Sequence, residues 1–204
     1  MFGFGKSKNQ SEPLFVVGNS SLFSKVQLTP TEFGREITRL GFQFGVAQFG
    51  QYQNSSSLSS QDIAFLNEVN QNPGIIQLLY TNLVAGAFLC FAKVILKPPQ
   101  EAILNIEAGI LTELRSTMQG MSEEIIEDHT KITMNFAIAI EREIKEIEEN
   151  SSLSLFFQYI SDFYPNLPSE LKAKIPLGLF NSISGLGSRF LAVCQNDFQL
   201  SLKQ

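Results

Sequence analysis

The chain has 204 residues, which is enough for one domain with its own hydrophobic core. Its net charge of -5 argues against a general nucleic-acid surface, because phosphate binding needs a clustered excess of Lys and Arg. Only 17% of residues are charged and 18 are Phe, so we expect some apolar surface to be covered by a partner or a second copy.

The N-terminal residues predict a loose arm followed by a short hairpin. Residues 1–13 mix Gly, Ser, Lys and Pro, and we expect a flexible arm there and a single helical domain over residues 14–204. GFGKS imitates the end of a phosphate-binding loop, but the first Gly of that motif would precede Met1, so the match fails. The segments LFVV and LFSKVQL predict two extended stretches that pair across the four-residue loop GNSS.

The first helix has sequence signals at its start. Thr29 stands at the N-cap position, Pro30 at the first helical position and Glu32 three residues after the cap. Gly41 and Gly45 would each weaken the helix by about 1 kcal/mol relative to Ala. We therefore expect either a closely packed helix on that face or a break. The predicted apolar stripe is Phe33, Ile37, Leu40, Phe44 and Ala47.

This helix has more Phe than one stripe can bury. At 100° per residue, Phe42 and Phe49 fall about 20° apart, and Phe44 lies about 160° from Phe49. If Phe44 faces the core, Phe42 and Phe49 point away from it on either side of Gly45. We consider Phe42, Gly45 and Phe49 a candidate contact patch for another subunit or partner. The alternative is that neighbouring helices or the N-terminal arm cover these residues.

The middle of the chain predicts a second helix and an apolar third one. Ser59 and Asp62 start the second helix, which we expect to end near Asn72. The segment from Ile75 to Lys97 is about 34 Å long as a helix, which is enough to cross a bilayer. We favour a buried central helix, because the amphipathic helices around it need an apolar element to cover.

Two amphipathic helices follow. Pro99 opens the fourth and Gly120 ends it, while Ser122 caps a fifth that we expect to reach about Glu149. Residues 134–140 are apolar on all sides, which predicts a second central element. The predicted stripes are Ile103, Ile110, Leu114 and Met118 in the fourth helix, and Ile125, His129, Ile132, Phe136, Ile140, Ile144 and Ile147 in the fifth.

The single histidine, His129, lies near Glu124, Glu127 and Asp128 in the sequence. A carboxylate metal site in a helical bundle would use a Glu three residues before each of two His residues, whereas residue 126 is Ile and no second His exists. We therefore expect no metal site. The favoured interpretation is a core or boundary histidine bonded to a carboxylate.

The C-terminal part predicts a sixth helix that ends at Tyr164 and a last one that starts at Ser169 and is interrupted at Pro176. The segment SISGLGSR resembles a Gly-x-Ser-x-Gly nucleophile elbow, but its glycines are misplaced. A small anion site beside Arg189 is one interpretation of this segment. Helix packing or a kink is the alternative.

The cysteines and the N-terminus predict the compartment. Cys90 and Cys194 each lie in an apolar run, where a thiol behaves as a small hydrophobic group. The N-terminus lacks the charged and apolar regions of a signal peptide, so we expect a cytoplasmic protein.

These patterns predict an all-α, single-domain bundle of about seven helices, possibly with a short N-terminal extended hairpin. The expected function is that of a non-enzymatic interaction protein that binds a protein partner or its own copy, without a cofactor. The alternative is an apolar-ligand-binding or membrane-active bundle.

Overall fold

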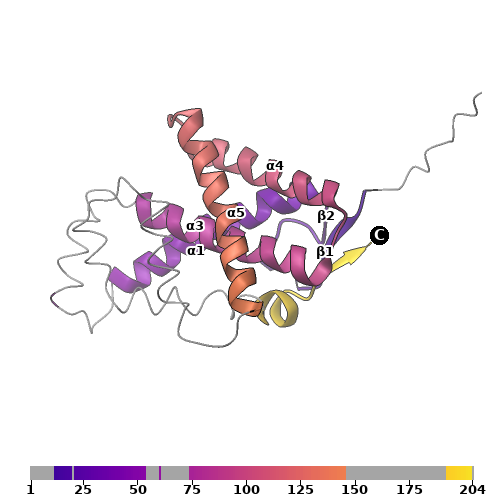
Figure 1. Ribbon diagram of the computed structural model, residues 1–204. Coiled ribbons are helices and arrows are strands. Elements are labelled where there is room, and N and C mark those ends of the chain that lie inside the picture. The colour runs from indigo at the N-terminus through magenta and orange to yellow at the C-terminus, as the bar shows by residue number, and fades with distance from the viewer. Residues whose placement is uncertain (1–11, 20, 54–59, 61–73, 146–191, 204) are drawn as a thin grey trace, which may run out of the picture.

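The computed structural model describes residues 12–19, 21–53, 60, 74–145 and 192–203. Four long helices form the body of the described part, and a small sheet lies at one end of it (Figure 1). The helices are α1 (Pro30–Gln53), α3 (Gly74–Phe91), α4 (Gln100–Thr117) and α5 (Glu123–Lys145). Two π-helical turns, η1 (Ala92–Leu96) and η2 (Val193–Asp197), and the strands β1 (Leu14–Val17), β2 (Gln27–Leu28) and β3 (Leu200–Lys203) complete it.

The fold is mostly helical with a three-stranded sheet, so the all-α expectation needs correction. The predicted hairpin exists, because β1 pairs antiparallel with β2. Its connection is longer than the predicted four residues and covers residues 18–26. Phe23, which we assigned to an extended segment, instead leaves the sheet and is buried in the core. The second, sixth and last predicted helices lie outside the described residues, and so do residues 1–11 of the flexible arm that we expected over residues 1–13.

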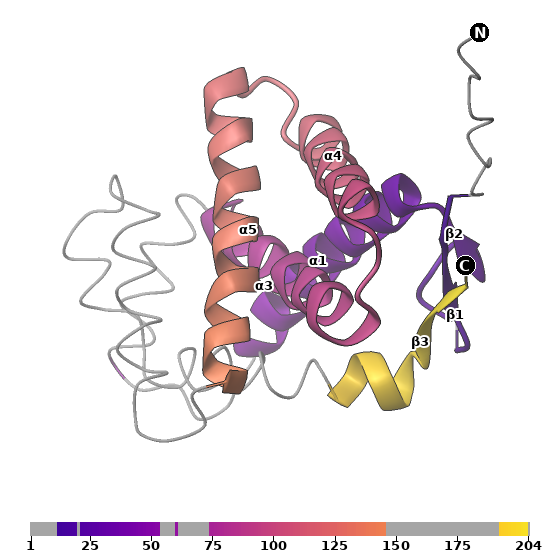
Figure 2. The same cartoon turned by 45° about the vertical axis from the view of Figure 1, so that its right-hand side comes forward.

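The third strand comes from the other end of the chain. The strand order is β2-β1-β3, and β3 pairs antiparallel with β1 so that Val17 opposes Leu200 and Phe15 opposes Leu202. Both chain ends therefore meet in one sheet, beside η2 (Figure 2). The sequence analysis did not predict β3.

The start of α1 is the predicted capping box. The Thr29 backbone N–H donates to Glu32 Oε2 at 3.0 Å, and the Glu32 N–H donates to Thr29 Oγ1 at 3.3 Å. These bonds satisfy two donors that the first helical turn would otherwise leave without partners. The helix then runs unbroken to Gln53, so the prediction of a break at its glycines is wrong.

Glycines allow α1 to touch two other helices. A Cβ added at Gly34 would lie 2.1 Å from the carbonyl oxygen of Ile106 in α4, and one at Gly41 would lie 2.8 Å from that of Thr81 in α3. Gly109 of α4 is equally close to α1, with Thr31 O at 2.2 Å. Close helix approach is therefore the correct interpretation for Gly41. The surroundings of Gly45 are outside the described residues.

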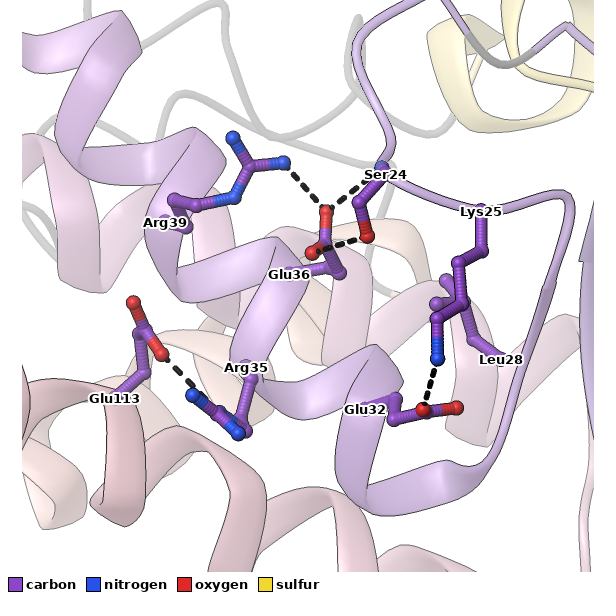
Figure 3. A pocket seen from close by; sticks show the side chains of 8 residues that line it. All are labelled: Ser24, Lys25, Leu28, Glu32, Arg35, Glu36, Arg39 and Glu113. Atoms are coloured by element: carbon purple, nitrogen blue, oxygen red, sulfur yellow. Dashed lines mark hydrogen bonds and ion pairs between the residues drawn. The ribbon is translucent and has the colours of Figure 1, made fainter.

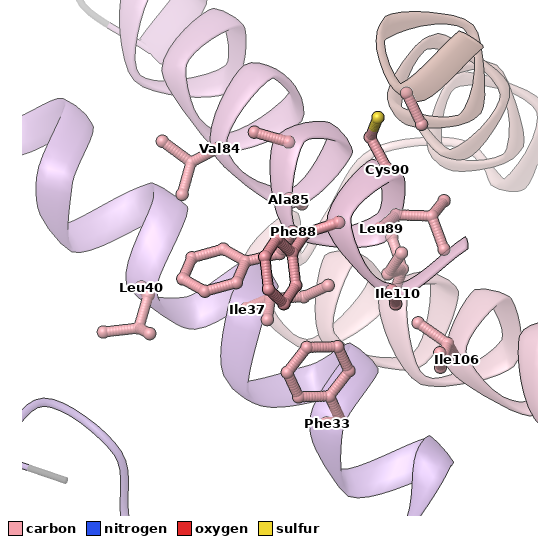
Figure 4. Packing of buried hydrophobic residues seen from close by; sticks show 14 of the residues in the cluster. Phe33, Ile37, Leu40, Val84, Ala85, Phe88, Leu89, Cys90, Ile106 and Ile110 are labelled. Atoms are coloured by element: carbon pink, nitrogen blue, oxygen red, sulfur yellow. The ribbon is translucent and has the colours of Figure 1, made fainter. Parts of the chain in front are cut away.

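The third helix is the central element, as predicted. Residues 81–92 are all buried, between α1 on one side and α5 on the other (Figure 2). Phe33 and Ile37 of α1 point toward its apolar side chains (Figure 4). Within the described residues, no helix combines the length and apolar character needed to cross a membrane.

Helix α5 is less central than the sequence suggested. Ile132, Phe136 and Ile140 are buried, but Ile138 is exposed, so residues 134–140 are not enclosed on all sides. Ile125, which we placed on the buried stripe, is 43% exposed, and its neighbour Ile126 is buried instead. The reason is that the two residues point about 100° apart around the helix, and Ile126 takes the inward direction.

An aromatic cluster joins the sheet to the helices. Phe15 of β1 stacks on Phe33 of α1 with ring centroids 4.4 Å apart, and Phe33 makes an edge contact with Phe88 of α3. Phe23 and Phe198 both pack against Phe88 and against each other. Such ring pairs contribute beyond the area they bury. The two ends of the chain are thus anchored on the same helix pair.

Candidate functional site

The predicted contact patch lies on the outward face of α1, and the structure describes the surroundings of only part of it. Phe42 is half-buried, and Val46, one turn later on the same face, is 45% exposed. Phe44 packs against the core, and Phe42, two residues earlier on the helix, is about 200° away from it around the axis. The side-chain surroundings of Gly45 and Phe49 are outside the described residues, and their part of the patch stays a prediction.

Val46 was missed in the sequence analysis, although the signal was there. On a helical wheel Val46 falls about 40° from Phe42 and about 60° from Phe49, so Phe42 lies between the other two and all three share one face. Residues 40–61 contain no charged residue and no histidine. The C-terminal half of α1 therefore presents an apolar face without charge, beside the start of α3 (Figure 1).

His129 lies in a polar cluster between α3 and α5. Asn82 Nδ2 lies 2.9 Å from His129 Nδ1, and the Thr133 hydroxyl lies 3.2 Å from Asn82 Oδ1. The same hydroxyl is 3.1 Å from the backbone oxygen of His129. Asn82 and Thr133 are fully buried and His129 is partly buried. The hydrogen bond described for His129 goes to the amide of Asn82, and sequence proximity could not indicate this partner because it comes from another helix.

Burial dominates the electrostatics of His129. Desolvation lowers its pKa, because the charged imidazolium loses water, and Asp128 opposes this shift with its negative charge. Asp128 in turn accepts a hydrogen bond from Lys131 at 3.0 Å. The two effects together leave the pKa of His129 below its usual value, so the neutral imidazole is favoured. The described residues contain no group of three or more His, Cys, Asp or Glu side chains that could hold a metal ion.

A charged pocket of about 240 Å³ lies between the loop before β2, α1 and α4 (Figure 3). Its ion pairs are Lys25 with Glu32 at 2.5 Å, Arg35 with Glu113 at 3.2 Å, and Arg39 with Glu36 at 2.5 Å. The lining residues are Ser24, Lys25, Leu28, Glu32, Arg35, Glu36, Arg39 and Glu113.

The charges of this pocket hold the loop on α1. Burial tends to raise the pKa of Glu36, but hydrogen bonds from Arg39 and Ser24 outweigh it and leave this pKa below its usual value. The pKa of Glu32 is also lowered, mainly by its bond to Lys25. Ser24 donates to Glu36 through both its backbone N–H and its hydroxyl. These contacts explain why the chain bends at Ser24 where we expected a strand.

Both cysteines are buried, as their apolar surroundings predicted. Burial raises the pKa of the Cys194 thiol well above its usual range, and Cys90 nearby adds to the shift. A thiol with a raised pKa carries little thiolate and reacts slowly. Arg189, the other weak polar candidate, lies outside the described residues.

The chain matches no known protein-family model, curated protein or solved structure. An interpretation of its function therefore rests on the described geometry.

Proposed function

We propose that this protein acts by non-enzymatic association, and that the outward face of the C-terminal half of α1 is the surface that binds. The observation that carries the proposal is the exposure of Val46 beside Phe42 in a stretch, residues 40–61, that lacks charge. The centres of protein interfaces are depleted in charged residues and enriched in aromatic ones. A surface of this composition matches that description.

The partner that fits this surface best is a second copy of the chain. In a two-fold interface each residue meets the same surface on the partner, so any charge near the axis faces its own kind. A face without charge avoids that repulsion. The absence of charge also gives no basis for selecting a charged partner by electrostatic complementarity.

The alternative of an apolar-ligand-binding bundle has less support. The pocket beside α1 is lined by six charged side chains, which do not suit an apolar molecule.

Val46→Glu tests the proposal. A carboxylate in the middle of a desolvated interface leaves an unpaired charge, so we expect the variant to lose self-association while its far-ultraviolet circular dichroism and melting temperature stay unchanged. Mass is measured by size exclusion with light scattering over a range of protein concentrations. Leu104→Glu is the matched control, because Leu104 is 54% exposed on α4 and lies on a different helix.

Two results would contradict the proposal. The first is a wild-type protein that stays monomeric at high concentration. The second is an associated Val46→Glu variant alongside a Leu104→Glu variant that dissociates, which would place the interface on α4.

A further inference from the structure

The polar cluster of Asn82, His129 and Thr133 lies where α3 and α5 approach most closely. A Cβ added at Gly86, one turn after Asn82, would lie 2.9 Å from the Thr133 carbonyl oxygen and 2.8 Å from Phe136 Cβ. The two backbones therefore leave no space beside the cluster for a rearrangement of the helices. A change in hydrogen bonding must first be accommodated by the side chains themselves.

The donors and acceptors of the cluster form a consistent set when His129 is neutral. Asn82 Nδ2 donates to His129 Nδ1, so this ring nitrogen is an acceptor and carries no proton. The Thr133 hydroxyl has one hydrogen and two acceptors within reach, Asn82 Oδ1 and the His129 carbonyl oxygen. It donates to one of them at a time.

Uptake of a proton at His129 Nδ1 makes this set inconsistent. The new N–H would face the Asn82 amide N–H₂, which places two donors 2.9 Å apart. A half-turn of the Asn82 amide exchanges its oxygen and nitrogen. His129 Nδ1–H then donates to Oδ1, Nδ2 donates to the Thr133 hydroxyl oxygen, and the hydroxyl donates to the His129 carbonyl oxygen.

We propose that Asn82, His129 and Thr133 form a proton-responsive junction between α3 and α5, in which the Asn82 amide reverses when His129 takes up a proton. The proton comes from solvent and no covalent bond other than N–H forms. These three groups thus have two hydrogen-bond arrangements with the same helix positions, and the protonation of His129 selects between them.

Among the described residues, the charged side chains considered around His129 come from α4 and α5. Helix α3 has no charged side chain between Gly74 and Phe91. Helix α4 contributes Arg115, which pairs with Glu123 at the start of α5. Among the described residues of α5, the charged side chains nearest in sequence to His129 are Glu124, Glu127, Asp128 and Lys131. Burial opposes the charged state and lowers the pKa of His129, while Asp128 favours that state.

Nitrogen-15 NMR of the full chain tests this mechanism, because the single histidine gives unambiguous imidazole signals. We expect Nδ1 to be unprotonated at pH 8 and to show a coupling to Asn82 Nδ2 across the hydrogen bond. Below the titration midpoint that coupling should vanish, and the Asn82 amide signals should move with the same midpoint. A protonated Nδ1 at pH 8, or an Asn82 amide that does not respond to the titration, would overturn the proposal.

Thr133→Val separates this mechanism from simple burial. In the reversed state the hydroxyl makes two hydrogen bonds, one as acceptor and one as donor, whereas in the neutral state it makes one. The variant should therefore lower the titration midpoint of His129 by about half a unit to one unit. Thr133→Ser keeps the hydroxyl and should titrate like the wild type. A midpoint in Thr133→Val that is equal to or higher than that of Thr133→Ser would contradict the proposal.

Discussion

The two halves of α1 differ in charge, in packing and in what they leave exposed. The N-terminal half carries Glu32, Arg35, Glu36 and Arg39, all in ion pairs, and Gly34 brings it into backbone contact with α4. The C-terminal half has no charge and exposes Val46. The first half of this helix is therefore held by contacts with the rest of the fold, and its second half carries the face that we propose for association.

The largest effect is expected where α3 supports α1. Val84 is fully buried in α3 (Figure 4). It follows Thr81 by three residues, and the Thr81 carbonyl oxygen faces Gly41 at the boundary between the two halves. Val84→Asp would bury an unpaired carboxylate, which costs more than about 4 kcal/mol and should abolish soluble folding. The soluble yield and the melting temperature of the variant measure this loss of folding. Ile95→Asp at an exposed position of η1 is the control, and a Val84→Asp protein with wild-type melting temperature would contradict the central position of α3.

A pair of identical substitutions compares the two halves directly. Gly34→Ala places a methyl group 2.1 Å from a backbone oxygen that cannot rotate away, and we expect a loss of about 2–3 kcal/mol in the free energy of unfolding. A Cβ at Gly50 meets nothing within 4 Å, so Gly50→Ala should stabilise the protein by roughly 0.5–1 kcal/mol. Denaturant unfolding of both variants measures whether each substitution raises or lowers the free energy of unfolding. Equal effects at both positions would show that the halves are packed alike.

Acid should weaken the N-terminal half through its carboxylates. The pKa of Glu36 is lowered in the folded protein from 4.5, so its stabilising contribution is present above about that pH and is lost as the pH falls through the folded value. We expect Glu36→Gln to show a smaller loss of unfolding free energy than the wild type on acidification over this range. Denaturant unfolding at several pH values measures the difference. If the unfolding free energies of the two proteins fall in parallel as the pH falls, the hydrogen bonds from Arg39 and Ser24 do not stabilise the charged form of Glu36.

Local patterns predicted much of the fold. The capping box at Thr29 and the buried third helix depend on neighbouring residues, and both are confirmed. The fourth helix ends at Thr117, shortly before the predicted stop at Gly120. Strand β3 could not be predicted in this way, because its four residues become a strand only by pairing with β1 at the far end of the chain.

The hydrogen-bond partners of the site residues could not be predicted from the sequence either. Sequence proximity suggested a carboxylate for His129, but its partner Asn82 comes from another helix. The bend at Ser24 depends on Glu36, which lies one turn into a helix that had been predicted separately. These features depend on contacts between residues far apart in the chain, and no local sequence pattern indicates such contacts.

The labelling rate of a thiol at position 46 tests most directly whether the C-terminal half of α1 binds a second copy. Buried Cys90 and Cys194 should react slowly, so that a Val46→Cys variant gives a distinct fast signal with a maleimide reagent. We predict that its labelling slows as the protein concentration rises, while the rate for Leu104→Cys stays constant. A rate at position 46 that does not depend on protein concentration would contradict the proposed interface.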